Sequence, residues 1–245
     1  MQFGKPFSFV FEDPDWFKKL AILALLGFAQ LIPGIGSIFM ALVFSGVMVD
    51  IVRKVINKET PTIPSLDIGT QFMDGLKLWV VNLVYSLPMI VLGIIIAIIA
   101  ALGGVGGFMG AENDNAGAIG AVGVIVIILI SCVGLIMLLY GLLIALITPE
   151  ITARYAKFGT IGSALKFKEV FKTVFKKPVP YILAFVGVVL VGIVGGIAAS
   201  ILASIGAIAL GIGALYGVAI ATVFISLASG HFYGQAHNAA TEELA

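Results

Sequence analysis

The sequence predicts an all-α membrane protein, a polytopic helical bundle that crosses the bilayer six times. Sixty per cent of the residues are hydrophobic and only 11% are charged. A soluble domain needs about a quarter of its residues charged to cover its surface. The apolar residues also form long runs, and about 20 helical residues cross the ~30 Å hydrocarbon core of a bilayer.

Five breaks divide the apolar sequence into six predicted spans. The first break is the segment Pro33-Gly34-Ile35-Gly36, because proline and glycine both interrupt a helix. We predict a tight hairpin there, with a re-entrant break as the alternative. The other breaks are the polar stretches 53–77 and 150–177, the glycine-rich stretch 103–117 and a tight turn at 204–206. The predicted spans are residues 17–32, 36–56, 78–102, 119–148, 178–203 and 207–230.

The basic residues predict that both termini lie in the cytoplasm. Lysine and arginine accumulate on the cytoplasmic side of a membrane. With six spans, all fourteen basic residues fall on one side, and the opposite side holds Glu112 and Asp114. If Pro33 only kinked one long helix, the N-terminal lysines would lie outside. The charge distribution therefore favours six spans.

We predict one transmembrane domain, residues 1–245, made of three similar units. The units are residues 1–57, 58–151 and 152–232, with a short cytoplasmic tail at 231–245. Each unit is an interfacial amphipathic helix followed by a transmembrane hairpin. Arg53 and Arg154 follow the even-numbered spans, and Phe72-Met73-Asp74 corresponds to Phe167-Lys168-Glu169. Such similarity also arises in unrelated hairpins, because every cytoplasmic end needs aromatic and basic anchors.

The clearest interfacial helix is predicted just before span five. Its apolar stripe has the spacing i, i+3, i+4, i+7 and consists of Phe167, Val170, Phe171 and Val174. We predict that four lysines around this helix contact lipid headgroups: Lys166, Lys172, Lys176 and Lys177. A helix of this kind lies in the interface plane and is attracted by anionic lipid. The alternative is that the stripe packs against the protein's own loops.

Weaker signals mark the interfacial segments of the other two units. Asp13-Pro14-Asp15 predicts a helix start, with an N-cap carboxylate before a proline at the first helical position. In the second unit one apolar face is predicted from Ile68, Phe72, Leu76 and Trp79. The opposite face of that segment carries Asp67, Gln71 and Asp74.

Several short motifs, most of them in the first half of the chain, match a known pattern. They are Glu12-Asp13-Pro14-Asp15-Trp16, Lys58-Glu59 followed by Ile63-Pro64, Asp74-Gly75-Leu76-Lys77, and Tyr85 with Pro88. Together they resemble the domain-of-unknown-function 4013 family of multi-span membrane proteins from archaea and bacteria. The resemblance implies a prokaryotic cell membrane, and it implies no activity, substrate or catalytic residue.

The residue types do not favour an enzyme. Hydroxyl side chains occur within the spans, but no histidine or carboxylate lies deep in a span to activate them. His231 and His237 follow the last predicted span and would fall on different faces of a helix. Cys132 is the only cysteine, and no cluster of cysteine and histidine can hold a metal. We therefore expect no cofactor.

A non-enzymatic membrane protein of accessory, scaffolding or lipid-interacting type is the remaining expectation. The alternative is an uncoupled small-solute transporter or channel, because backbone carbonyls can line a pore. Ion coupling is not expected, since no ionisable residue lies near the predicted midplane. Asp50 is expected to pair with Arg53. Glu150 is expected to pair with Arg154.

Small residues at four-residue spacing predict close helix approach. They are Gly192 with Gly196, Ala199 with Ala203, Ser200 with Ser204, and Gly213 with Gly217. Such faces serve packing inside the monomer, self-association or a partner subunit. The basic residues suit the headgroups of membrane lipids better than nucleic acid.

Overall fold

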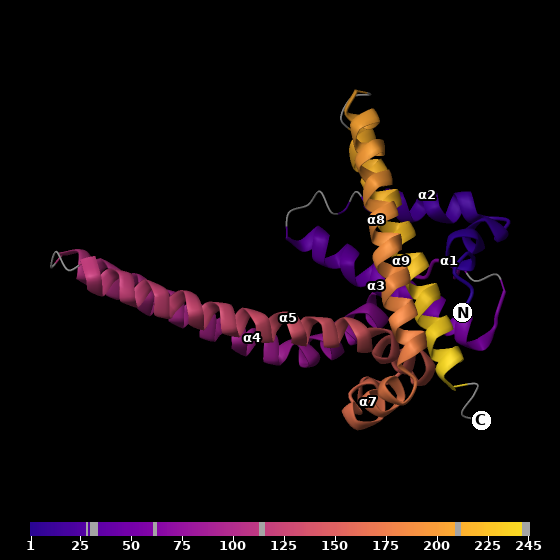
Figure 1. Ribbon diagram of the computed structural model, residues 1–245. Helices are drawn as coiled ribbons and strands as arrows, with labels where there is room; N and C mark the ends of the chain where they lie inside the picture. Colours follow the sequence, from indigo (N-terminus) through magenta and orange to yellow (C-terminus); the bar gives the residue numbers. More distant parts are fainter. Residues whose placement is uncertain (28, 30–33, 61–62, 113–115, 209–211, 242–245) are drawn as a thin grey trace. The chain divides into compact units, whose positions relative to one another are not determined.

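The computed structural model is helical in every regular element that it describes. Backbone is described for residues 1–245 except 28, 30–33, 61–62, 113–115, 209–211 and 242–245, and side chains are not described for 103–122 and 205–217 either. The elements are α1 (Lys5–Ser8), η1 (Phe9–Glu12), α2 (Trp16–Gly27), α3 (Ile35–Asn57), α4 (Ile68–Glu112), α5 (Ala116–Phe158), α6 (Ile161–Ala164), α7 (Phe167–Lys176), α8 (Pro178–Ile208) and α9 (Ile212–Thr241) (Figure 1). The all-α prediction is confirmed.

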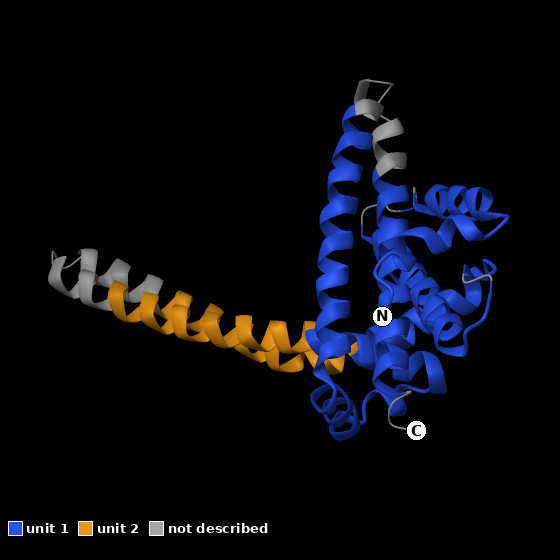
Figure 2. Ribbon diagram, turned by 45° about the vertical axis from the view of Figure 1, so that its right-hand side comes forward, with its two compact units in different colours: residues 1–81, 146–245 blue, residues 82–145 orange. Residues whose placement is uncertain are grey.

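The chain divides into two compact units, coloured separately in Figure 2. Unit 1 comprises residues 1–81 and 146–245, and unit 2 comprises residues 82–145. Unit 2 contains α4 from Asn82 onward and α5 up to Ala145. A hydrogen bond joins them, from the hydroxyl of Tyr140 to the carbonyl of Tyr85 over 2.7 Å. Most of the large apolar side chains described in unit 2 are exposed, as expected for helices whose surroundings are hydrocarbon.

Four helices in the described part of the chain are long and apolar enough to cross a membrane. They comprise residues 35–57, 68–102, 123–158 and 178–204. The first predicted span corresponds to α2, which has 12 residues and is therefore only about 18 Å long. The sixth corresponds to α9, whose initial side chains lie outside the described residues. Spans one and six therefore stay predictions.

Two predicted boundaries are wrong. The glycine-rich stretch 103–117 is not a loop throughout, because α4 continues to Glu112 and α5 begins at Ala116. Glycine disfavours a helix by only about 1 kcal/mol per residue, so it does not by itself end one. The turn predicted at 204–206 is also helical, since α8 ends at Ile208. The predicted break at Pro33 lies outside the described residues, and α3 follows it directly.

The interfacial helix predicted for the second unit is not a separate element. Residues 68–79 form the first turns of α4 and continue into the span without interruption. Gln71 and Asp74, predicted to face away from the apolar side, are buried, whereas Trp79 is half exposed. Two polar side chains of this segment therefore lie inside the protein. Asp74 and the amide nitrogen of Gln71 are hydrogen-bonded there, whereas Oε1 of Gln71 has no hydrogen-bond partner among the described residues.

Helices α3 and α4 cross with their backbones in direct contact. A Cβ atom on Gly46 would lie 1.8 Å from the carbonyl oxygen of Gln71, and one on Gly75 would lie 1.8 Å from that of Leu42. No side chain larger than hydrogen fits at either position. Glycine at such a crossing also permits Cα–H···O contacts between the helices. This crossing brings Gln71 and Asp74 of α4 beside Asp50 and Arg53 of α3.

Helix α9 packs against α3 and α8 through small residues (Figure 1). Cβ atoms on Gly230 and Gly234 would meet α3 at the carbonyl of Met48 (3.0 Å) and at Val55 (2.6 Å). On α8, Gly187 contacts the ring of Phe232 in the same way. The segment predicted as a tail after residue 230 is thus helical to Thr241 and largely buried. Spacing of four residues marks this interface, as it does in other membrane helices.

The small residues predicted on α8 have a different environment. Cβ atoms on Gly192 and Gly196 would meet nothing within 4 Å, and Ser200 and Ser204 are exposed. Their hydroxyls donate to backbone carbonyls one turn earlier in the same helix. This face therefore contributes nothing to the packing described within the monomer. The pair Gly213 and Gly217 lies outside the described side chains.

The N-terminal segment packs against α3 and α9. Phe9 and Leu23 belong to one buried cluster with Met40 of α3 and Leu227 of α9. Asp13 accepts the backbone N–H of Asp15 and the ammonium of Lys19, at 2.8 and 2.6 Å. Its carboxylate thus binds a backbone N–H as predicted, but α2 begins at Trp16 and not at Pro14. Burial raises the pKa of Asp13, but the hydrogen bonds from Lys19 and Asp15 and the charge of Lys19 outweigh it and leave the pKa below its usual value.

Candidate lipid-facing site and buried polar networks

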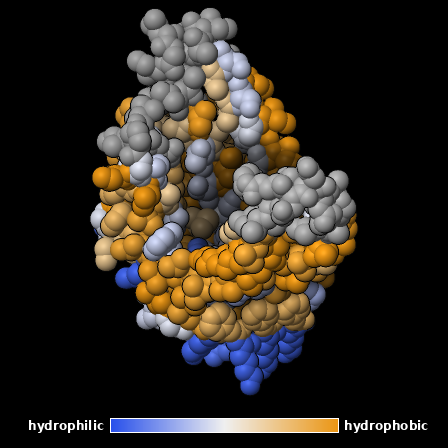
Figure 3. Space-filling model, turned by 90° about the vertical axis from the view of Figure 1, so that its left-hand side faces the viewer, coloured by the Kyte–Doolittle hydropathy of each residue, from blue (hydrophilic) through white to orange (hydrophobic). Residues whose placement is uncertain are grey.

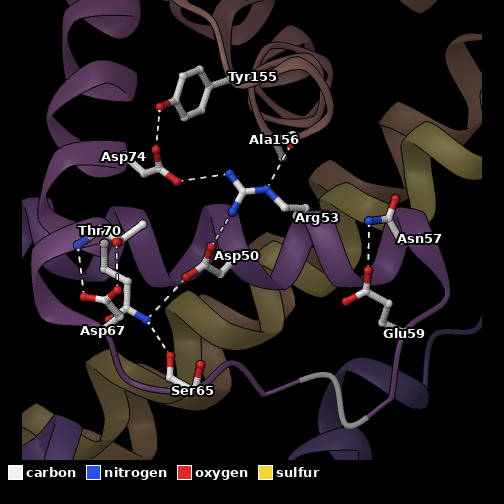
Figure 4. Close-up of polar contacts among 11 residues, drawn as sticks. Asp50, Arg53, Asn57, Glu59, Ser65, Asp67, Thr70, Asp74, Tyr155 and Ala156 are labelled. Carbon is white, nitrogen blue, oxygen red and sulfur yellow. Dashed lines mark hydrogen bonds and ion pairs between the residues drawn. The ribbon is translucent and has the colours of Figure 1, made fainter.

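A polar network surrounds Arg53 where α3 crosses α4 (Figure 4). The guanidinium donates to Asp50 over 2.6 Å and to Asp74 over 3.0 Å, and its Nε donates to the carbonyl of Ala156 over 3.1 Å. The hydroxyl of Tyr155 donates to the other oxygen of Asp74 over 2.8 Å. The expected pairing of Asp50 with Arg53 is confirmed. The arginine thereby links α3, α4 and α5.

Helix α4 begins beside this network with a side-chain cap. The carboxylate of Asp67 accepts the backbone N–H and the hydroxyl of Thr70 (Figure 4). These hydrogen bonds from Thr70 hold the pKa of Asp67 below its usual value. The amide nitrogen of Gln71 donates to Asp50 over 3.3 Å and to the carbonyl of Ser65 over 3.1 Å. The connection between α3 and α4 is thus fixed to both helices.

A second network surrounds Glu150, which is 1% exposed. The hydroxyl of Tyr181 on α8 donates to Glu150 over 2.6 Å, and Nδ1 of His237 on α9 lies 2.9 Å from the same oxygen. Because a carboxylate only accepts, Nδ1 carries the proton. Arg154 lies 3.9 Å from the other oxygen, so the expected pairing is present but long. The carboxylate joins α5, α8 and α9.

The repeat seen in the sequence has a counterpart in these networks, although the contacts of Asp74 and Glu169 with the arginines were not predicted. Asp74 and Glu169 occupy matching positions in the compared segments, and in the structure each contacts the arginine of the preceding helix. The aromatic and histidine partners could not be predicted. Tyr181 and His237 meet Glu150 from other helices, and His237 was assigned to a tail. The spacing of Gly230 and Gly234 was the one signal that α9 continues as a packed helix.

Helix α7 presents three different faces. Val170 and Val174 are buried in the protein. Phe167, Phe171 and Phe175, one turn apart, form an aromatic row beside them, and Phe171 stacks on Phe175 with 5.9 Å between ring centroids. Phe167 and Phe175 are 44% and 56% exposed. The predicted apolar stripe is therefore divided, because its valines pack internally and its phenylalanines do not.

The four predicted headgroup lysines do not share one face. Lys172 and Lys176 are exposed and form a row with Lys168, directly beside the aromatic row. Lys166 lies on another side of the helix and forms an ion pair with Glu169 over 3.4 Å. Lys177 follows the last residue of α7 and is half buried. The sequence-based prediction did not include Lys168, although Lys168, Lys172 and Lys176 are spaced by four residues.

Two clefts adjoin α7. One, of about 460 Å³, lies at the start of α8 and is lined by Lys176, Lys177, Val179 and Leu183 among others. The other, of about 560 Å³, lies between the end of α5 and the start of α7, with Arg154 and Lys166 in its wall. The described residues contain no group of three side chains that could hold a metal. Hydrophobic residues cover most of the described surface in Figure 3, and strongly hydrophilic residues gather in one place on it.

Long apolar helices joined by buried polar networks define an all-α, multi-helix membrane protein. A family model described as "Protein of unknown function (DUF4013)" matches residues 25–204. The chain belongs to this family, which confirms the resemblance found in the sequence. Neither the curated proteins nor the solved structures contain a match to this chain.

Proposed function

We propose that this protein is a non-enzymatic, accessory or scaffolding membrane protein that holds anionic lipid at the cytoplasmic leaflet through α7. One observation carries the proposal. The aromatic row (Phe167, Phe171, Phe175) lies beside the lysine row (Lys168, Lys172, Lys176), while the third face of the same helix is anchored in the protein by Val170 and Val174.

The chemistry of the two rows fits the boundary between acyl chains and headgroups. Aromatic rings concentrate in this zone, and lysine stems extend along apolar surface while their ammonium groups reach headgroups. Each basic residue near an anionic surface contributes about 1 kcal/mol. Because the valines already fix α7 to unit 1, binding does not require the helix to fold on the membrane. The cleft beside Lys176 and Lys177 gives a headgroup room next to this surface.

We further infer six spans in three hairpins, with both termini cytoplasmic in a prokaryotic cell membrane. Contacts within unit 1 support a common side. Lys19 approaches the carbonyl of Ile63 at 3.5 Å, and the amide of Gln235 donates to the carbonyl of Gln2 over 3.2 Å. Asn238 donates to the carbonyl of Val55 over 3.0 Å. The N-terminal segment, the end of α9 and the connection after α3 therefore lie together, and the basic residues of that connection favour the cytoplasm.

The orientation is tested with single cysteines. After Cys132→Ser, we expect an impermeant thiol reagent added to intact cells to label Asn113→Cys. It should leave Thr160→Cys unlabelled until the cells are opened. Labelling of Thr160→Cys in intact cells would reverse the orientation and with it the assignment of α7 to the cytoplasmic leaflet.

The lipid proposal is tested with the full chain in vesicles. A fluorophore on Phe167→Cys, in the Cys132→Ser background, should be quenched several-fold more by brominated phosphatidylglycerol than by brominated phosphatidylcholine at equal mole fraction. The double variant Lys172→Gln, Lys176→Gln should lose most of this difference, because about 1 kcal/mol is removed per lysine.

A matched control removes two exposed lysines from another part of unit 1, with Lys18→Gln and Lys58→Gln. The net charge changes by the same amount as in Lys172→Gln, Lys176→Gln, but brominated phosphatidylglycerol should still quench the fluorophore more than brominated phosphatidylcholine does. If both double variants lower the preference to the same degree, the attraction is a property of the net charge and α7 is not a lipid site. Equal quenching by both lipids in the unsubstituted background would contradict the proposal directly.

A further inference from the structure

The cleft between α5 and α7 contains a buried cation whose main partner is exposed. Arg154 is 11% exposed, donates to the carbonyl of Ser163 over 3.1 Å and contacts the carboxylate of Glu169. Glu169 is 49% exposed, and its hydrogen bond from Arg154 holds its pKa below the usual value. Arg154 is therefore already paired with an anion, the carboxylate of Glu169, which lies at the mouth of the cleft.

The corresponding arginine of the repeat is 36% exposed but has two close carboxylate partners. Arg53 makes two short ion pairs, of which the partners Asp50 and Asp74 are 17% and 12% exposed. Arg154 lacks an equivalent second short pair, because its distance to Glu150 is 3.9 Å. Tyr181 and His237 already donate to Glu150. Hence Glu150 keeps its hydrogen bonds whether or not Arg154 turns toward another anion.

The rest of the cleft supplies what an anionic headgroup requires. Lys166 adds a second cation at the rim, 58% exposed. The exposed residue Thr160 adds a hydroxyl group to the lining. Phe158 is 53% exposed, and the guanidinium of Arg154 and the ammonium of Lys157 both lie 5.8 Å from its ring centroid. A planar guanidinium binds two phosphate oxygens at once, and the volume of about 560 Å³ exceeds that of a phosphate group.

We propose that this cleft binds the phosphate monoester of a membrane lipid such as phosphatidic acid, and that Glu169 is the built-in competitor that the phosphate displaces from Arg154. A phosphate monoester carries about −1.5 to −2 charges at neutral pH and therefore competes with a carboxylate better than a phosphodiester with one charge. This site deepens the proposed lipid function, since it adds selection of a headgroup to the general attraction exerted by the rows on α7.

Native mass spectrometry of the full chain in detergent tests the proposal. Phosphatidic acid, phosphatidylglycerol and phosphatidylcholine with identical acyl chains are added separately, and inorganic phosphate is added as a fourth ligand. We expect phosphatidic acid to bind at least fivefold more tightly than phosphatidylglycerol. Glu169→Gln should raise the affinity for phosphatidic acid about tenfold, because the competitor is removed. Lys166→Gln should lower it several-fold.

The gain in Glu169→Gln cannot result from a damaged fold, so it separates binding from stability. If this variant binds phosphatidic acid no better than the natural chain, the competitor assignment is wrong. Inorganic phosphate that displaces phosphatidic acid at equal concentration would overturn the assignment to a lipid. The double variant Lys172→Gln, Lys176→Gln should keep the preference for phosphatidic acid over phosphatidylglycerol. If only the quenching experiment with Lys172→Gln, Lys176→Gln gives the contrary result, the proposed function is refuted. If only Glu169→Gln fails to raise the affinity for phosphatidic acid, this site is refuted.

Discussion

Replacing Gly46 by alanine is expected to cost about 3 kcal/mol or more of unfolding free energy. Overpacking a close-packed interior costs about 1–3 kcal/mol and occasionally more. Here the added methyl group would lie 1.8 Å from the backbone carbonyl of Gln71, which cannot rotate away as a side chain would. The α3–α4 crossing must therefore separate, and the network of Arg53 and Asp74 separates with it. Thermal unfolding in detergent and the folded fraction on size-exclusion chromatography measure the loss.

The matched control is Gly134→Ala in α5. Its added Cβ would meet nothing within 4 Å, and alanine favours a helix over glycine by about 1 kcal/mol. We expect unchanged or slightly higher stability. Comparable losses in Gly46→Ala and Gly134→Ala would show that glycine is required for a reason other than the crossing.

Glu150→Ala is expected to destabilise the protein by about 3–5 kcal/mol, the usual cost of breaking a buried charged pair by removing one partner. The substitution leaves the Tyr181 hydroxyl and Nδ1 of His237 without their common acceptor. Helices α5, α8 and α9 lose the side chain that joins them. Chemical unfolding followed by tryptophan fluorescence provides the measurement.

Glu169→Ala serves as the control, because Glu169 contacts the same arginine from an exposed position. Its effect on stability should be far smaller than that of Glu150→Ala, since solvent screens exposed ion pairs and can replace the lost partner. Equal losses in the two variants would mean that the charge of Arg154, rather than the buried acceptor shared by three helices, determines stability.

Much of the fold followed from composition and periodicity, because a bilayer allows few backbone solutions. The helical class, the capping role of Asp13 and the pairs of Arg53 with Asp50 and of Arg154 with Glu150 could be predicted. The extent of the helices could not, since glycine in stretch 103–117 was given the meaning it has in soluble loops. The lengths and the ends of the helices also depend on the helices against which they pack. Helix α9 continues past residue 230, where Gly230 and Gly234 pack on α3.

The candidate site was predicted only in part, and for a related reason. Periodicity showed that α7 has an apolar stripe, but it cannot show which part of the stripe another element covers. Because Val170 and Val174 are buried, the exposed surface of α7 consists of the phenylalanines and of the lysine row that includes Lys168. The role of Arg154 needed the distance to Glu150 and the exposure of Glu169, neither of which is a property of the local sequence.

The packing of α9 on α3 also has a consequence for biosynthesis. The partner of Val55 is Gly234, and the partner of Gln2 is Gln235, so the first helices complete their contacts only when the last one has been made. At a synthesis rate of about 5–20 residues per second, roughly 10–30 s separate α3 from α9. During that interval the face of α3 that α9 covers, around Met48, Ile51 and Val55, has no native partner. The packing of α3 is therefore completed only after α9 has been made, and chaperones or insertion factors that shield α3 would have their effect in this period.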